Sequence, residues 1–587
     1  MSSQKHSEHP ARDLAGQLTK GKSVVEPGEF AGGIAQEMAS LPQIRIGRAW
    51  LTTSKILTVL VPLGFVLVLV SVATAQQLRT MPEIQGFIKT YPGTGIFCQP
   101  VHGGFPWWLR YQHYLNLFLM LFMVRSGLQI LADHPRLYLD GDCTPGREWF
   151  RLRGPVPTDR IWTAKDDCVA LPGWLGLPGI RHSIGLARWW HFSMDTLWLL
   201  NGIIFYALLF STDQWRRLIP QSWDLIPNAV STAIQYASLN FPPASGWLQY
   251  NALQQVAYFT TVFVAAPLAM VTGLLQSPAV AARFKTAKGL LNRQISRTAH
   301  FCILGYFITF VIVHVSMVFS TGLLANLNHI TRGVNDASFR GLLLFGIGIG
   351  LIAAAWLAAS PFTLRYPRLV QHGGRLITGW FRDLFETFRP IAGFEEKDIS
   401  PYFWPNGNGP ESEEYRKLAA GEFKEFQLKV GGLVENPFEI SFAGLKALPK
   451  SEQITQHYCI QGWSGIAKWG GVRMSEIMKI ARPKPEARYV IFYSFAHGAG
   501  ENEGLYYDAH KIEHMHHKNS ILAYEMNGKP LPELNGAPLR VRNELELGFK
   551  QVKWVQGMEF VATFKDHGSG EGGFNEDHEY FGYRAPI

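Results

Sequence analysis

The sequence contains few cysteines, and none of them are clustered. The five stand at Cys98, Cys143, Cys168, Cys302 and Cys459. An iron–sulfur centre or a structural zinc ion needs several closely spaced thiolates, often in a CxxC motif, so this spacing argues against both. The first 45 residues also lack a twin-arginine pair and a short apolar core after a basic start. Residues 1–50 are therefore expected to form a flexible cytoplasmic tail.

Acidic residues are concentrated after residue 392, whereas most apolar residues precede residue 362. The chain has 587 residues, more than one hydrophobic core usually supports, so at least two domains are expected. The net charge of +9 does not indicate nucleic-acid binding, because the basic residues border apolar segments and form no stripe on a soluble face. The composition predicts a membrane domain over 51–362, a cytoplasmic linker over 363–397 and a soluble domain over 398–587.

Six apolar segments are each long enough to cross a hydrocarbon core that needs roughly 20 residues of helix. They are residues 55–75, 107–131, 186–211, 256–276, 297–320 and 341–361. Lys and Arg are concentrated in alternate loops, which predicts that the N-terminus and the C-terminal domain lie on the cytoplasmic side of a bacterial inner membrane. The first segment ends in an A-x-A pattern that resembles a signal cleavage site, but the fifty residues before it favour an uncleaved helix.

Four histidines lie inside these segments, where a polar side chain is costly and usually functional. They are His113, His191, His300 and His314. His300 and His314 are fourteen residues apart on one helix, so both project from nearly the same face with about 21 Å of rise between them. Antiparallel packing sets His191 level with His300. It sets His113 level with His314. Each histidine alone is equally well explained as an interhelical hydrogen-bonding residue, but two matched pairs predict two heme sites.

This pattern resembles the b-type cytochrome subunits of formate dehydrogenase, nickel–iron hydrogenase and thiosulfate reductase. The similarity covers about residues 105–362 and includes HYLNLFLMLFMVRSGLQIL, which begins at His113, and RWWHF, which contains His191. In that family such histidine pairs bind two b hemes, and quinone commonly exchanges electrons near one of them. The resemblance implies that the four histidines are heme ligands. It also implies that quinone, quinol or a redox protein is a partner at the lipid membrane.

Residues 398–587 predict an α+β domain rich in strands, because short apolar runs alternate with Gly, Pro and Asn turns. Segments such as ARYVIFYSFA and QVKWVQGMEFVATF are typical of strands, and MSEIMKIA is typical of a short helix. Cys459 lies in the motif HYCIQGWSGIAKWGGV of this domain. From spacing alone, a buried structural cysteine is favoured over a metal ligand or a nucleophile, since no base stands next to it.

Three motifs of this domain resemble the molybdopterin-binding domain of the sulfite oxidase superfamily, particularly bacterial relatives of the methionine sulfoxide reductase catalytic subunit. They are HYCIQGWSGIAKWGGV, ILAYEMNGKPLPELNGAPLRVR and GFKQVKWVQGMEF, in the family's order and spacing. The resemblance implies that Cys459 binds molybdenum. It also implies that Arg540 and Lys553, together with Lys550, hold the pterin phosphate. Exposed strand charge is the alternative for these basic residues.

A further cluster consists of His510, His514, His516 and His517. His510 and His514 would share a helical face, but no cysteine or acidic framework surrounds them. A solvated or substrate-facing surface is therefore favoured over a metal site.

Together these features predict a membrane-bound molybdenum oxidoreductase that passes electrons between a cytoplasmic molybdopterin site and quinone, or another partner, through two b hemes. Its substrate would be sulfite or another small oxyanion, or an S- or N-oxide, and the direction of the reaction stays open. The alternative is a membrane cytochrome b conduit whose C-terminal domain is a non-catalytic binding or assembly module with a purely structural Cys459.

Overall fold

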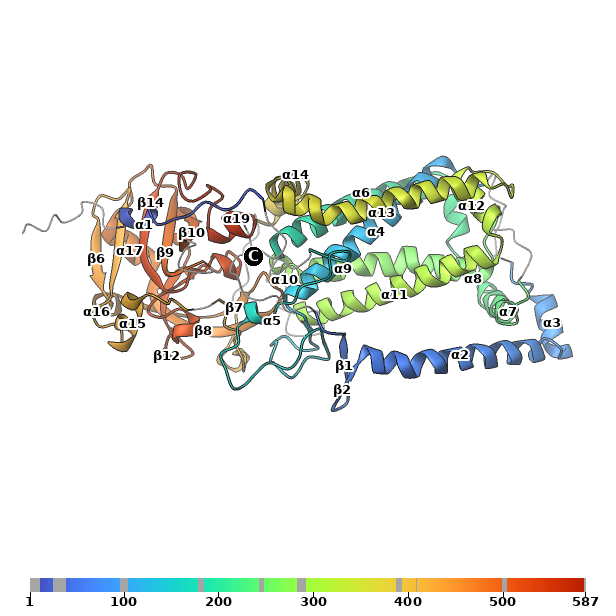
Figure 1. The fold of residues 1–587 in the computed structure, drawn as a ribbon, viewed down its shortest axis with the longest axis horizontal. Coiled ribbons are helices and arrows are strands. Elements are labelled where there is room, and N and C mark those ends of the chain that lie inside the picture. The colour runs from blue at the N-terminus through green and yellow to red at the C-terminus, as the bar shows by residue number, and fades with distance from the viewer. Residues whose placement is uncertain are drawn as a thin grey trace, which may run out of the picture.

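The structure is a computed structural model of the whole chain. It describes residues 11–24, 39–94, 104–177, 184–241, 247–281, 292–386, 393–407, 409–498 and 504–584. Figure 1 shows a long helical bundle at one end of the molecule and a β-rich domain at the other. The predicted division into a helical membrane part and a strand-rich part is confirmed.

Six helices in the described part of the chain are long and apolar enough to cross a membrane, which confirms the predicted number of spans. They are α2 (Thr53–Leu78), α4 (Trp107–Asp133), α6 (Ile184–Ser211), the continuous helix Ala252–Gln276, α11 (Arg293–Ser320) and α13 (Arg340–Arg365). The fourth of these consists of α8 (Ala252–Phe259), the π-helical turn η2 (Thr260–Ala265) and α9 (Ala266–Gln276). Shorter helices at the bundle's outer end are α3 (Pro82–Thr90), η1 (Asp213–Arg217), α7 (Leu225–Ala237) and α12 (Leu323–Thr331).

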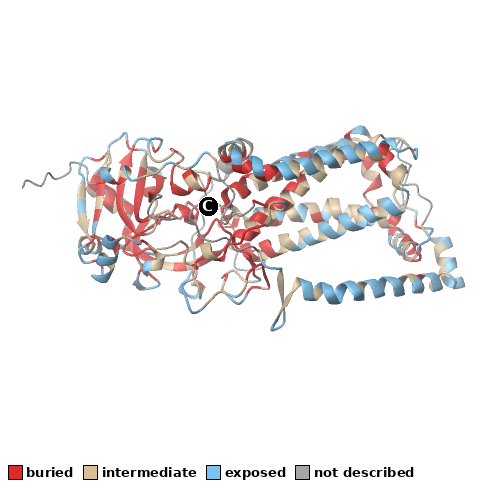
Figure 2. Ribbon diagram, viewed as in Figure 1, coloured by how far each residue is buried: buried red, intermediate tan, exposed pale blue. Residues whose placement is uncertain are grey.

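Helix α2 stands apart from the other spans in Figure 1. Ala75 is its only buried residue, and Figure 2 shows the helix exposed along its length. Its contacts are with α7 at one end and with β2 (Ala49–Thr52) at the other. The packed part of the membrane domain therefore consists of the other five spans.

Two stretches of the N-terminal region pack against the rest of the protein, so the prediction of a flexible tail over residues 1–50 is wrong for them. Helix α1 (Arg12–Ala15) lies on the C-terminal domain, where Leu14 is buried against Ile491 and Tyr493. The backbone of Gly21 donates to Ser569 Oγ at 2.7 Å. Strand β1 (Gln43–Ile46) joins a small sheet next to the membrane helices. The burial of Leu14 holds the first stretch and strand pairing holds the second, and the polar composition of the region indicates neither contact.

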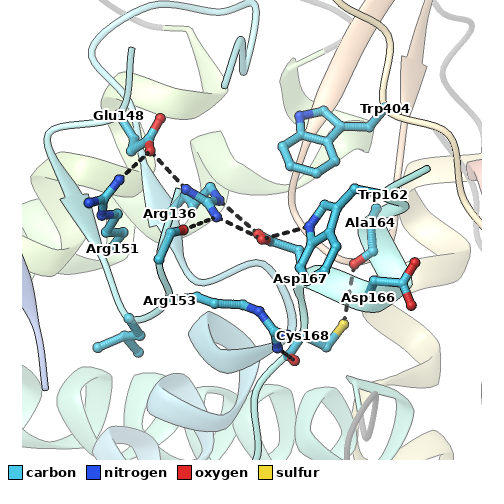
Figure 3. A network of polar contacts seen from close by, with 12 residues as sticks. Arg136, Glu148, Arg151, Arg153, Trp162, Ala164, Asp166, Asp167, Cys168 and Trp404 are labelled. Carbon is cyan, nitrogen blue, oxygen red and sulfur yellow. Dashed lines mark hydrogen bonds and ion pairs between the residues drawn. The ribbon is translucent and has the colours of Figure 1, made fainter. Parts of the chain in front are cut away.

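Residues 134–177, between α4 and α6, form a compact platform under the C-terminal domain. Strands β3 (Arg136–Leu137) and β4 (Phe150–Arg151) complete the sheet of order β2-β1-β4-β3, and α5 (Ala164–Asp167) follows. Figure 3 shows the polar network at its centre, where Arg136 donates to Glu148 and Asp167 at 2.8 Å. All three side chains are buried, so these charge-assisted bonds hold the loop in one conformation.

The C-terminal domain contains two sheets around one core. The first has the order β10-β9-β14-β5-β6, with only β14 and β5 parallel, and the second has the order β12-β11-β8-β7 with β13 paired to β11. The strands are β5 (Gln427–Gly432), β6 (Phe438–Ser441), β7 (Lys450–Tyr458), β8 (Ser464–Arg473), β9 (Tyr489–His497), β10 (Leu505–Lys511), β11 (Ile521–Met526), β12 (Lys529–Pro530), β13 (Arg540–Arg542) and β14 (Val555–Val561). Its short helices are η4 (Glu396–Asp398), α15 (Glu413–Ala420), α16 (Phe442–Ala447), α17 (Met474–Ala481), α18 (Ile512–Met515), η6 (Glu533–Asn535), η7 (Gly548–Lys550) and α19 (Phe574–His578). Val430, Trp469 and Phe492, from both sheets, belong to one buried cluster.

The predicted linker 363–397 contains a long helix, α14 (Pro367–Glu386), which packs against α6. A Cβ at Gly374 would lie 2.7 Å from the Trp189 ring, so glycine permits the two helices to approach closely there. Much of the segment is therefore a packed helix and not an extended linker. The sequence did not indicate this because the contacts are made with residues distant along the chain.

Candidate cofactor sites

His113 and His314 face one another in the half of the bundle farther from the C-terminal domain. Their ring centroids are 6.3 Å apart. A metal–imidazole bond of about 2.0–2.1 Å plus roughly 1.1 Å to each ring centre would separate two rings on one metal by about 6.3 Å. Tyr258 Oη lies 3.3 Å from His314 Nδ1, which leaves Nε2 available as a ligand. The spacing of the two rings therefore fits a metal ion that both would hold.

His191 and His300 lie toward the C-terminal domain, each seven residues after the start of its helix. His191 Nδ1 lies 3.1 Å from the Met123 carbonyl oxygen, and His300 Nδ1 lies 3.0 Å from the Thr272 hydroxyl. A contact at Nδ1 fixes the tautomer and orients the ring so that Nε2 can bind a metal. Both rings thus have the outer contact that metal-binding histidines usually have.

Asp195 is an acidic neighbour of this second pair. Its Oδ2 lies 3.5 Å from His191 Nε2, one helical turn along α6. A metal on that nitrogen would place the carboxylate beside it, so Asp195 must turn aside or contribute negative charge there. A glycine lies close to each ring. A Cβ at Gly127 would be 3.2 Å from His191 Cε1, and a Cβ at Gly273 would be 3.6 Å from His300 Cε1.

Cys459 lies in the tight loop between β7 and β8, at the base of the C-terminal domain. The Cys459 backbone N–H donates to the Trp463 carbonyl at 3.1 Å, and Gly462 has a φ of +117°, which favours glycine. Only 2% of Cys459 is exposed to solvent. Cys459 lines a cavity of the C-terminal domain, its thiol donates to Gln461 Oε1 at 3.4 Å, and its carbonyl oxygen accepts from Arg293 of α11.

The first turn of α11 binds this loop directly. Arg293 donates to the carbonyl oxygens of Cys459 at 3.3 Å and of Trp463 at 3.2 Å. Gln294 Nε2 donates to the Gly462 carbonyl at 3.0 Å. Because His300 stands two helical turns after Arg293, about 10 Å of helix rise separates the loop contact from that histidine. The cysteine loop and one histidine pair therefore share a rigid support.

The platform holds the other side of the loop. Gln461 Nε2 donates to the Ala164 carbonyl at 3.2 Å and contacts Cys168 Sγ at 3.1 Å. Trp404 Nε1 donates to the Cys143 carbonyl at 2.7 Å. The cysteine loop is thus enclosed between the platform, α11 and its own sheet.

A cavity of about 140 Å³ opens beside Cys459. Its lining includes Cys459, His457, Arg540, Lys553, Asn406 and Lys165. Lys165 comes from α5 of the platform and lies 3.7 Å from Glu579 in ion-pair contact. The membrane domain therefore completes one wall of a cavity that belongs mainly to the C-terminal domain.

Arg540 and Lys553 bring two basic side chains to this cavity. Arg540 donates to the Asn535 carbonyl at 3.1 Å, and Lys553 donates to the Leu534 carbonyl at 3.0 Å. No carboxylate among the described residues lies within ion-pair distance of either. Burial, with Arg542 as the next cause, lowers the pKa of Arg540 to about 9. Burial and then Arg540 lower the pKa of Lys553 well below its usual value. Two buried basic groups that lack a carboxylate partner are the arrangement expected of an anion site, because a bound anion would favour the charged form of both.

Lys550 does not line this cavity, which corrects the expectation that it grips the pterin phosphate together with Arg540 and Lys553. Its ammonium group is buried against the carboxylates of Asp508 and Glu576, the latter at 2.8 Å. Although burial opposes the charge, these two carboxylates raise the pKa of Lys550 above its usual value. Its charge is already compensated, so Lys550 supports the fold around the cavity.

The four histidines of the 510–517 cluster differ in their surroundings. His510 is buried, and its Nε2 lies 2.6 Å from the Lys550 carbonyl, so a solvated position is wrong for this residue. His516 is exposed and directly follows α18. Among the described residues, no group of three or more His, Cys, Asp or Glu side chains could hold a metal ion.

His457 is a cavity residue that the sequence analysis missed. It lines the cavity two positions before Cys459, and its Nδ1 lies 2.9 Å from Arg542 Nη1. Alternation along a strand places residues two apart on the same side, so this signal was present in the sequence. Burial, followed by Arg540 and Arg542, lowers the pKa of His457 well below its usual value. The ring is therefore neutral, and because Nδ1 accepts from Arg542, its Nε2–H is the donor that remains.

Two protein families match separate parts of the chain. Residues 104–333 match the family described as prokaryotic cytochrome b561, and residues 417–567 match the oxidoreductase molybdopterin binding domain. The first match contains all four membrane histidines. The second contains Cys459, Arg540 and Lys553.

Three relatives are informative. A putative protein-methionine-sulfoxide reductase subunit, YedZ1 of Azospira oryzae, is 31% identical over 168 residues, which are 29% of this chain and 58% of that protein. The protein-methionine-sulfoxide reductase catalytic subunit MsrP of Xanthomonas axonopodis pv. citri is 34% identical over 148 residues, 24% of this chain and 46% of that protein. The uncharacterized oxidoreductase YuiH of Bacillus subtilis is 35% identical over 141 residues, 24% of this chain and 67% of that protein. The chain spans about half the length of the first two.

Proposed function

Because the chain belongs to the molybdopterin-binding oxidoreductases and carries a cytochrome b561 domain in front of that fold, we propose that it is a membrane-bound molybdoenzyme with a built-in heme relay. The observation that carries this proposal is the contact between the Cys459 loop and α11. Arg293 donates to the loop, and His300 follows on the same helix. A non-catalytic binding or assembly module would not need its cysteine loop in contact with a helix that carries a heme-ligand candidate.

In this proposal the Cys459 thiolate holds molybdenum, while Arg540 and Lys553 hold the phosphate of the pterin. Molybdenum at such a site supplies the transfer of one oxygen atom to or from the substrate, together with two electrons. Arg540 provides a planar fork of donors and Lys553 a point charge, and a bound phosphate would compensate both. His457 and Lys165 border the remaining space and are placed to orient a polar substrate.

The four membrane histidines are proposed to bind two b hemes, His191 with His300 and His113 with His314. The first pair lies near the Cys459 loop and the second near the opposite end of the bundle, so electrons would cross the membrane between them. Quinone, quinol or a redox protein is the proposed partner at the far end. The distribution of Lys and Arg supports a cytoplasmic C-terminal domain in a bacterial inner membrane.

The proposed substrates are S- or N-oxides and small oxyanions such as sulfite. Two relatives named for protein methionine sulfoxide favour an S-oxide, whose reduction consumes two electrons and two protons and releases water. Membranes containing the chain should be mixed with methionine sulfoxide or sulfite while heme absorption is followed. Oxidation of reduced heme by the first, or reduction of oxidised heme by the second, identifies substrate and direction together.

Metal analysis of the purified chain tests the enzyme itself. We expect stoichiometric molybdenum that is lost on Cys459→Ser. Cys143→Ser is the matched control, since Cys143 is equally buried but lies outside the cavity lining. Absent molybdenum, or unchanged retention in Cys459→Ser, would leave only the electron conduit.

A further inference from the structure

Helix α14 carries an exposed apolar stripe directly after the last membrane span. Leu369, Leu376 and Trp380 are 58%, 84% and 56% exposed. They are seven and four residues apart, a spacing that places them on one face of the helix. Only Tyr366 separates α14 from α13, so the stripe begins where that span ends. Three large apolar side chains in this position need an apolar environment.

The opposite face of α14 is packed on the protein. Gly374 lies against Trp189 near the start of α6, which sets the middle of α14 level with the ends of the spans. Figure 1 shows α14 nearly end-on, whereas the spans run along the long axis of the molecule. The helix therefore runs across the ends of the spans, as a helix does when it lies along a membrane surface.

We propose that α14 lies in the head-group layer of the bilayer, with Leu369, Leu376 and Trp380 inserted toward the acyl chains. The bilayer is the partner expected to cover this stripe, because the stripe follows a membrane span directly and lies level with the end of that span. Tryptophan is favoured at the membrane interface, and the exposed Arg365 at the end of α13 suits lipid phosphates. This inference concerns a lipid contact and holds whether or not the chain binds molybdenum.

The inner face of α14 connects this lipid contact to the cavity. Arg368 donates to the Glu576 carbonyl at 2.8 Å, and Gln371 donates to the Phe581 carbonyl at 2.7 Å. Phe581 lines the cavity beside Cys459. A helix seated in the bilayer would therefore hold one wall of the cavity in place.

The test uses the full chain in lipid nanodiscs, with a nitroxide label on Leu376→Cys in a background where Cys98 and Cys302 are replaced by Ser. Ile161→Cys is the matched control, since Ile161 is 67% exposed on the platform at the same end of the bundle. We expect the ratio of collisions with oxygen to collisions with a water-soluble nickel chelate to be at least about fivefold higher at position 376. Equal ratios would overturn the proposal. Trp380→Cys carries the same expectation if Leu376→Cys does not fold.

Hydrogen exchange tests the link to the cavity. Leu376→Glu should accelerate exchange in residues 571–581, whereas Ile161→Glu should not. Unchanged exchange in this segment, with α14 displaced from the bilayer, would show that the membrane contact does not support the cavity wall. Both readouts are independent of cofactor content.

Discussion

Replacing Arg293 by Met should release the Cys459 loop from the helix that carries His300. The Arg293 side chain is buried and donates to the carbonyls of Cys459 and Trp463. A hydrogen bond to a charged donor contributes about 1.5–3 kcal/mol net, so losing two removes roughly 3–6 kcal/mol. Since each 1.4 kcal/mol is about a factor of ten, the ratio of docked to undocked loop should fall by roughly 100-fold or more.

The assay is stopped-flow absorption of the hemes after mixing with substrate. Arg293→Met should slow electron transfer between substrate and heme at least about tenfold while molybdenum content is retained, because Arg293 does not line the cavity. Arg293→Lys keeps the charge and should restore part of the rate. Hydrogen exchange in residues 457–464 should rise in Arg293→Met, which reports undocking without relying on any cofactor.

Arg217→Met provides the matched control. Arg217 is also buried and donates to two backbone carbonyls, those of Trp247 at 3.1 Å and Gly104 at 3.3 Å, but at the opposite end of the bundle. It should leave both the transfer rate and the exchange of 457–464 unchanged. Normal transfer and normal exchange in Arg293→Met would refute the reasoning that this contact couples the two domains.

Three further predictions follow from the sites. His300→Ala should halve the heme content measured by pyridine hemochrome; an unchanged content would remove His300 from the ligand set. Arg540→Met should lower molybdenum retention with little loss of stability, whereas Lys550→Met should lower the free energy of unfolding by about 3–5 kcal/mol because it leaves two buried carboxylates unpaired. Because the pKa of His457 is depressed in the fold, its stabilising contribution is present above the unfolded pKa of about 6.5 and is lost as pH falls below it. Below about pH 6.5, the free energy of unfolding of the wild type should therefore fall by up to about 1.4 kcal/mol per pH unit relative to that of His457→Gln, as measured by thermal unfolding from pH 8 to 5. The same pH dependence in both proteins would contradict this.

The sequence alone determined the division into domains, the six spans and the histidine pattern. These depend on local properties: 20-residue apolar runs form helices in lipid, and a fourteen-residue spacing places two side chains on one face. Strands such as β9 and β14 were predicted for the same reason, since turns and β-branched or aromatic runs act locally. The cofactor roles of Cys459 and the basic residues came from resemblance and stay proposals.

Only the tertiary structure decided which charges are compensated and which elements meet. Lys550 and Lys553 are three residues apart in one motif, yet only Lys553 lines the cavity, because Asp508 and Glu576 reach Lys550 from distant segments. The contact between Arg293 and the Cys459 loop joins positions 166 residues apart. Side chains at such separations meet only when the whole chain has folded. No local pattern could therefore have revealed that the cysteine loop contacts the helix that carries His300.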